Sequence, residues 1–188
     1  MEVVAYRTRV DQSYICFQSD HLGGISPIHF SQELPLVERN ALPKNAVSLI
    51  KSYEKDAEKI RARYPNGFAK ITHLDFSNLD LHRLPPQILI ECQSAVTLDI
   101  SGNKINWLPI QLQELNITKL NISGNIGLQP NLYSFPWLLD MQKLEIIAND
   151  MGFNFIPPGW EGRLHSKEIP FASEWTDCPR QVLNGSYG

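Results

Sequence analysis

The feature that most constrains the fold of this chain is a leucine-centred pattern that recurs four times at nearly constant spacing. The repeats read ITHLDFSNLDLHRLP from residue 71, AVTLDISGNKINWLP from residue 95, ITKLNISGN from residue 117 and MQKLEIIAN from residue 141. Their anchors, separated by 24, 22 and 24 residues, are Leu74, Leu98, Leu120 and Leu144. A regular period of this length indicates a stacked fold, in which each unit packs against its neighbours.

Each anchor leucine starts a short alternation of apolar and polar residues. A second apolar side chain follows two positions later, at Phe76, Ile100, Ile122 and Ile146. A period of two indicates a short β-strand with one buried face. Because one repeat cannot bury that face alone, we expect four parallel strands stacked about 4.8 Å apart. The pattern therefore predicts a fold of the α/β class.

The same segments resemble the leucine-rich-repeat family, whose pattern is L-x-x-L-x-L-x-x-N-x-L-x-x-L-P. The resemblance covers residues 68–157, and its endings Leu84-Pro85 and Leu108-Pro109 are similar to those of intracellular members. It implies a short solenoid of about four repeats with the parallel sheet on its concave face.

In this family an asparagine just after each strand bonds to backbone groups of its turn and of the next repeat. An amide suits this role because it both donates and accepts hydrogen bonds. Asn103, Asn125 and Asn149 stand at this position, whereas Leu79 takes it in the first repeat. An atypical repeat is expected at the end of a stack, so the resemblance implies that the solenoid starts there.

The residues before the repeats predict a capping helix over 45–67. Asn45 is placed to cap a helix that runs to Arg63, and Pro65-Asn66-Gly67 stops it. One face of this helix is apolar at Val47, Ile50, Tyr53, Ala57, Ile60 and Tyr64. The other face mixes charges at Lys51, Glu54, Lys55, Asp56, Glu58, Lys59, Arg61 and Arg63, and is expected to be solvated. The helix would cover the first repeat.

The two ends of the chain give weaker patterns. Residues 1–44 form an N-terminal segment, in which Val3–Val10 and Tyr14–Gln18 predict a β-hairpin. Residues 158–188 form a C-terminal cap and tail, in which Trp160 and Trp175 could lie over the last repeat.

Nothing in the sequence indicates catalysis, a cofactor or a metal. The formal net charge of −3 disfavours nucleic acid, which needs a strongly basic surface. Cys16, Cys92 and Cys178 form no Cys-x-x-Cys pair, so neither a zinc site nor a disulfide framework is indicated. No P-loop, G-x-S-x-G or H-E-x-x-H motif is present. With no signal sequence and no apolar stretch of membrane-spanning length, we expect a cytoplasmic protein without a membrane partner.

The expected binding surface is the row of strand side chains that alternate with the buried ones. With the four anchors aligned, the first column is His73, Thr97, Lys119 and Lys143. The second column is Asp75, Asp99, Asn121 and Glu145, and the third is Ser77, Ser101, Ser123 and Ile147. The eight residues of the first two columns are the candidate protein-binding residues. A polar face with both charge signs suits a peptide or a protein surface.

We therefore expect a non-catalytic interaction module that binds a partner protein, such as an adaptor, a scaffold or a substrate-recognition subunit. This hypothesis follows from analogy of fold and not from a site. Two alternatives remain open. The chain could be the targeting fragment of a larger kinase, GTPase or ubiquitin ligase, or a pathogen effector that engages a host protein.

Overall fold

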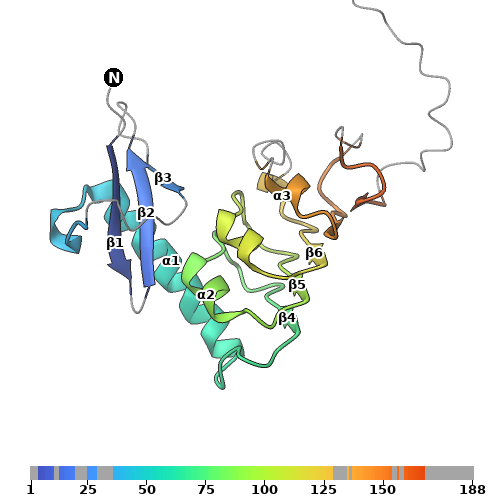
Figure 1. Ribbon diagram of the computed structural model, residues 1–188, viewed down its shortest axis with the longest axis horizontal. Helices are drawn as coiled ribbons and strands as arrows, with labels where there is room; N and C mark the ends of the chain where they lie inside the picture. Colours follow the sequence, from blue (N-terminus) through green and yellow to red (C-terminus); the bar gives the residue numbers. More distant parts are fainter. Residues whose placement is uncertain are drawn as a thin grey trace, which may run out of the picture.

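The described part of the chain forms an antiparallel and a parallel β-sheet (Figure 1). The computed structural model describes residues 4–10, 13–19, 25–28, 36–128, 135, 137–153, 156 and 159–167, and for the first three ranges only the backbone. With a five-stranded parallel sheet and several helices, the chain is of the α/β class, as the repeat pattern predicted.

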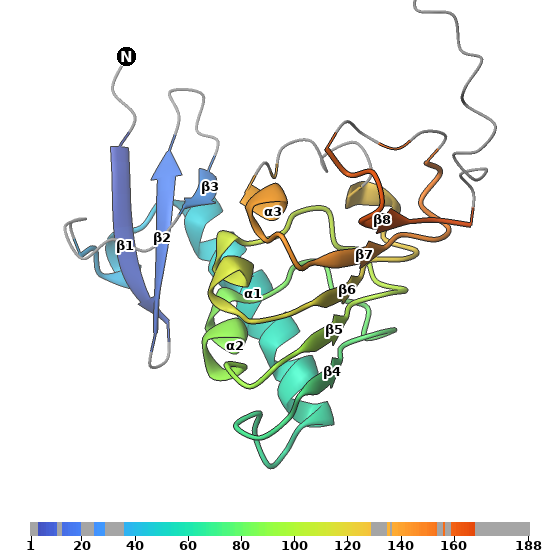
Figure 2. The same cartoon turned by 45° about the vertical axis from the view of Figure 1, so that its right-hand side comes forward.

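The parallel sheet follows the order of the sequence. Its strands are β4 (His73–Asp75), β5 (Thr97–Asp99), β6 (Lys119–Asn121), β7 (Glu145–Ile147) and β8 (Leu164–His165). Each strand pairs in parallel with the next one along the chain. Figure 2 shows the five strands stacked in one row, with the helices on one side of them.

The segments between the strands return along the side of the helices. They carry α2 (Pro86–Glu91), the 3-10 helix η2 (Ile110–Glu114) and α3 (Trp137–Asp140). Proline precedes α2 and η2, at Pro85 and Pro109, with extended backbone that sets the start of each short helix. A continuous hydrophobic core fills the space between these helices and the sheet.

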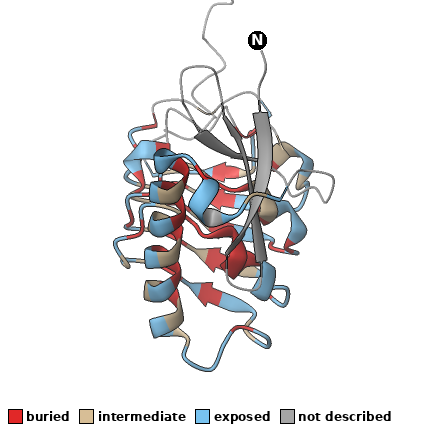
Figure 3. Ribbon diagram, turned by 90° about the vertical axis from the view of Figure 1, so that its left-hand side faces the viewer, coloured by how far each residue is buried: buried red, intermediate tan, exposed pale blue. Residues whose placement is uncertain are grey.

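The register confirms the predicted pairing for three of the four repeats. Leu74, Leu98 and Leu120 are directly paired neighbours, and all three are buried. In β4 to β7 the central residue is buried and its neighbours are more exposed (Figure 3). The next residue in this row is Ile146, followed by Leu164.

The predicted alignment of the fourth repeat is therefore wrong by two residues. Leu144 is buried but lies just before β7, and Ile146 pairs with Leu120 in its place. The physical reason is that this segment is apolar at Leu144, Ile146 and Ala148, so a two-residue shift still places apolar side chains in the core. The connection from β6 to β7 is accordingly longer than the anchor leucines suggested.

The shift also moves the asparagine that was predicted to follow the fourth strand. Asn125 lies five residues beyond Leu120, and the residue five beyond Ile146 is Met151. Met151 is buried in the core, whereas Asn149 is only partly buried. The prediction that Asn149 is equivalent to Asn103 and Asn125 is thus wrong.

Helix α1 (Lys44–Arg63) occupies the place where the sequence predicted a capping helix. Its N-cap residue is Pro43 and not Asn45, whose side-chain oxygen accepts a hydrogen bond from the N–H of Ala46. The buried face includes Ile50, Tyr53, Ala57 and Ile60, as predicted, together with Ala46 and Leu49.

Asp56 was predicted to lie on the solvated face of this helix, and it is instead 2% exposed. Its Oδ2 accepts hydrogen bonds from the backbone N–H groups of His82 at 3.0 Å and Arg83 at 2.9 Å, and Lys59 Nζ lies 3.2 Å from its Oδ1. A buried carboxylate needs such partners. Asp56 therefore ties α1 to the turn after β4.

The end of α1 covers the free edge of β4. The Tyr64 hydroxyl accepts a hydrogen bond from the N–H of Asp75 at 2.7 Å and donates one to the carbonyl of Asp75 at 3.2 Å. Arg63 Nη1 donates to the carbonyls of Asp75 and Ser77, at 3.1 and 2.9 Å. These contacts satisfy edge groups that have no neighbouring strand.

The opposite end of the sheet is closed by residues 159–167. Trp160 is buried in the core, and the guanidinium of Arg163 lies 5.5 Å from the centre of its ring. Arg163 donates to four backbone carbonyls, those of Leu138, Leu139, Met141 and Leu144. The sequence predicted that Trp160 covers the last repeat but did not predict strand β8; Trp175 lies outside the described residues.

The N-terminal segment forms the second sheet. Strands β1 (Val4–Val10) and β2 (Ser13–Ser19) pair antiparallel, as the sequence predicted, and β3 (Ile25–Ile28) adds to β2. This sheet lies beside the first half of α1 in both views (Figures 1 and 2). Among the described residues, no helix is both long enough and apolar enough to cross a membrane.

Candidate protein-binding face

The outward side chains of β4–β8 form three columns that differ from the predicted ones at the fourth strand. The first column is His73, Thr97, Lys119 and Glu145. The second column is Asp75, Asp99, Asn121, Ile147 and His165. The third continues beyond the strands as Ser77, Ser101, Ser123 and Asn149, with Lys167 beside Asn149. We call these three columns the outward face.

Six of the eight predicted binding residues keep the positions expected for them. The other two are corrected: Lys143 is exposed in the turn before β7 and joins no column, and Glu145 lies beside Lys119 instead of beside Asn121. The reason is the same two-residue shift that moved Leu144. Lys119 and Glu145, which carry opposite charges, therefore lie opposite each other in the register of β6 and β7.

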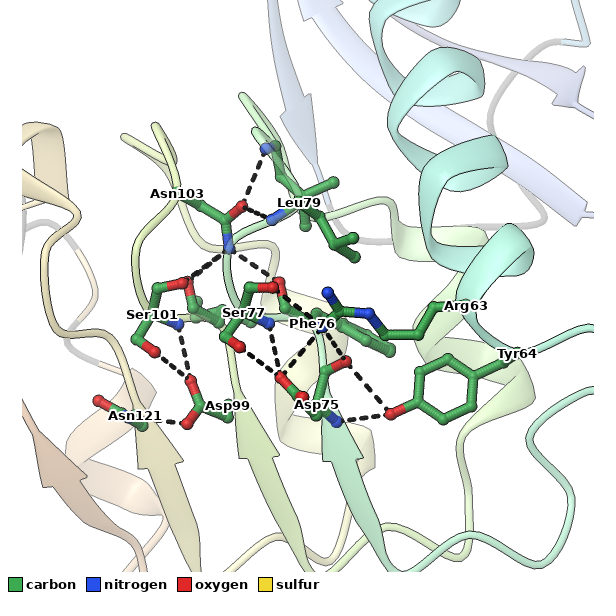
Figure 4. Close-up of polar contacts among 12 residues, drawn as sticks. Arg63, Tyr64, Asp75, Phe76, Ser77, Leu79, Asp99, Ser101, Asn103 and Asn121 are labelled. Carbon is green, nitrogen blue, oxygen red and sulfur yellow. Dashed lines mark hydrogen bonds and ion pairs between the residues drawn. The ribbon is translucent and has the colours of Figure 1, made fainter.

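The polar side chains of the second and third columns are fixed by a repeated contact (Figure 4). Asp75 Oδ1 accepts hydrogen bonds from both the N–H and the hydroxyl of Ser77, at 2.9 and 2.6 Å. Asp99 binds Ser101 in the same way, at 2.8 and 2.6 Å. Asn121 repeats the contact with Ser123. Such local bonds between residues two apart hold the side-chain oxygen in one orientation.

Lateral contacts connect the strands within a column. Asn121 Nδ2 donates to Asp99 Oδ2 at 2.8 Å, and His73 Nδ1 lies 2.9 Å from the hydroxyl oxygen of Thr97. At the β4 end, Arg63 Nη1 lies 3.2 Å from Asp75 Oδ1. These contacts therefore order five side chains of the first three strands before any ligand arrives: His73, Asp75, Thr97, Asp99 and Asn121.

The hydrogen bond from Ser77 and the nearby Arg63 guanidinium lower the pKa of Asp75, with Ser77 as the larger cause. Asp75 is therefore a carboxylate at neutral pH. An ionised side chain at the β4 end can attract a basic group but offers no proton for acid catalysis.

Two asparagines hold the turns just beyond the strands. Asn103 Oδ1 accepts from the N–H groups of Leu79 and Leu81, both at 3.0 Å, and its Nδ2 donates to the carbonyls of Phe76 and Ile100, at 2.9 and 2.8 Å. Asn125 makes the equivalent bonds one repeat later, to Ile105, Ile100 and Ile122. The predicted asparagine ladder is confirmed at these two positions.

The described residues contain no group of three or more metal-ligating side chains. Cys92 is fully buried, and burial raises the pKa of its thiol to about 12, with a smaller contribution from Glu91. A thiol with this pKa stays protonated at neutral pH, which agrees with the reading of Cys92 as a core residue. For Cys16 only the backbone is described, and Cys178 lies outside the described residues.

Sequence reasoning missed four residues of the outward face: Ile147 as a member of the second column, Asn149, His165 and Lys167. His165 and Lys167 lie in a segment that does not match the leucine repeat. Leu164 of β8 comes only 18 residues after its partner Ile146 of β7, and no asparagine follows it at the position of Asn103 and Asn125. The available signal was the buried pair Trp160 and Leu164, which continues the apolar core past residue 157.

A scan against protein-family models, a search of curated proteins and a search of solved structures each found no match to this chain.

Proposed function

We propose that this chain is a non-catalytic protein-interaction module, built as a short leucine-rich-repeat solenoid, and that it binds a partner protein through the outward face. Support for the repeat comes from three parallel strands in register and from the asparagine bonds at Asn103 and Asn125. The alternation within each strand separates the core from this face.

The observation that carries the proposal is the preorganised polar surface on the strands. Asp75, Asp99 and Asn121 are each held by a serine two residues on, and Asn121 also binds Asp99. Side chains ordered before binding lose little conformational entropy when a partner arrives. Charges of both signs in one surface favour orientation and fast association of the partner.

The test is a charge swap that leaves the net charge unchanged. Lys119→Glu together with Glu145→Lys reverses a pair on the outward face, and both side chains are exposed. We expect the swapped chain to lose affinity capture of its partner from a lysate, with an unchanged melting temperature. Partner bands would be quantified by mass spectrometry against the wild-type chain.

The matched control is Lys51→Glu together with Glu58→Lys on α1. These side chains are also exposed and the net charge is again conserved. The control should capture the partner as the wild-type chain does. Loss of capture in the control, with capture retained by the swapped face, would place the binding surface on α1 and refute the proposal.

A further inference from the structure

The corrected register gives the second column of the outward face a change in charge from β4 to β8, whereas the first column carries Lys119 on β6 and Glu145 on β7. The second column begins with the acidic Asp75 and Asp99 and finishes with the exposed His165. Lys167, also exposed, lies next to this end, because its N–H donates to Asn149 Oδ1 at 2.9 Å. One end of the face therefore favours a basic group and the other an acidic group.

The acidic end can accept further hydrogen bonds. Within the described part of the chain, the contacts of the Asp75 carboxylate with Ser77 and Arg63 all use Oδ1, which leaves Oδ2 for an outside donor. A carboxylate oxygen accepts two hydrogen bonds, so Asp99 Oδ2 has capacity beyond its bond from Asn121.

An apolar position interrupts the polar column near the basic end. Ile147 lies between Asn121 and His165 and is half-buried. An aliphatic side chain of a ligand can bury further apolar surface against it.

The distance between the two ends sets the length of the ligand. Four steps between neighbouring strands, at about 4.8 Å each, separate β4 from β8 by about 19 Å. An extended peptide advances at most about 3.3–3.6 Å per residue, so about six residues cross the face.

We propose that the outward face binds an extended peptide segment with a basic and an acidic residue about six positions apart and an aliphatic residue between them, two positions from the acidic one, so that all three side chains point to the same side of the peptide. The basic residue pairs with Asp75 and Asp99, the aliphatic residue contacts Ile147, and the acidic residue pairs with His165 and Lys167. This inference rests on the proposed function, because it names the kind of partner that the same face takes.

The test measures binding of four fluorescein-labelled synthetic peptides to the full chain by fluorescence anisotropy at low salt. The first carries Lys and Glu six positions apart with Leu between them, two positions from Glu, and the second has the same composition with Lys and Glu two positions apart. The third has two Lys and the fourth two Glu, at the six-position spacing. We expect the first to bind about tenfold more tightly than the others, and the difference to shrink as salt is added.

A charge reversal at Lys167 tests the inference through an increase in binding of one peptide, and misfolding of the variant cannot produce such an increase. Lys167→Glu should weaken the first peptide and strengthen the peptide with two Lys, because both ends of the face then favour basic groups. Lys51→Glu on α1 makes the same charge change at an exposed side chain and should alter neither affinity.

Three results would each overturn this inference: no binding of any peptide, equal affinity for all four, or equal effects of Lys167→Glu and Lys51→Glu. The proposed function fails by a different result, namely capture of the partner by the chain with the Lys119 and Glu145 swap. A partner protein that needs the outward face, with no peptide preference, would leave the proposed function standing and remove only this inference.

Discussion

Replacing Asn103 by Ala removes the side chain that joins the first two repeats. Four of its hydrogen bonds go to backbone groups of Leu79, Leu81, Phe76 and Ile100, and the last three of these bonds are buried. A buried backbone group left without a partner costs about 1 kcal/mol or more. Three such groups predict a loss of about 3 kcal/mol in the free energy of unfolding.

Urea unfolding followed by far-UV circular dichroism measures this loss as a shift of the midpoint at an unchanged m value. The matched control is Asn149→Ala, since the side chain of Asn149 makes only one exposed bond to the described residues, from the N–H of Lys167. We expect this control to lose less than about 1 kcal/mol. Equal losses in the two variants would refute the corrected register, and a wild-type midpoint for Asn103→Ala would refute the ladder.

Further predictions concern the core, the helix and two ionisable groups. Leu98→Ala, at a fully buried strand position, should cost about 2–5 kcal/mol in urea unfolding. Asp56→Ala leaves two backbone N–H groups after β4 unpaired and should cost about 2 kcal/mol in the same assay, whereas a wild-type midpoint would contradict its role. Iodoacetamide at pH 8 should label Cys92 slowly in the native chain and rapidly in urea, because burial raises its pKa to about 12; mass spectrometry of the peptide reports both rates. Ser77→Ala should raise the pKa of Asp75 in an NMR titration, since Ser77 is the main cause of its lowering. Because the folded-state pKa lies below the unfolded value, the stability that Asp75 contributes is present at neutral pH and lost as the pH falls through the folded pKa, and solvent screening keeps it small.

The sequence predicted the strands correctly where two patterns agree, namely the alternation of apolar and polar residues and the Gly-Asn that follows it. Around Leu98 and Leu120, the alternation is followed by Gly-Asn, and φ is +63° at Gly102 and +71° at Gly124. This left-handed turn suits glycine and fixes one register. At Leu144 the alternation continues through Ile146 and Ala148 without Gly-Asn, and the left-handed residue there is Asp150, with φ +55°. The apolar pattern alone therefore does not choose between two registers that bury the same kinds of residue.

The candidate site was less predictable because it depends on register and on contacts distant in sequence. A two-residue error leaves the core almost unchanged but moves Lys143 off the face and brings Ile147 onto it. The burial of Asp56 depends on backbone N–H groups 26 and 27 residues later, which no local charge pattern encodes. A charged residue on a helix is usually solvated, and Asp56 departs from that expectation because its carboxylate accepts hydrogen bonds from these two backbone groups.

The cover that Arg63 and Tyr64 place on β4 has a consequence for self-association. An uncovered strand at the side of a sheet is a template on which a second chain can add its own strand, and repetition of this step produces aggregates. A fragment that begins at residue 66 would keep every strand of the parallel sheet yet lose the hydroxyl and guanidinium that occupy the Asp75 and Ser77 backbone groups. Such a fragment should self-associate through β4, because the last turn of α1 is what keeps a second chain from pairing with that side of the sheet.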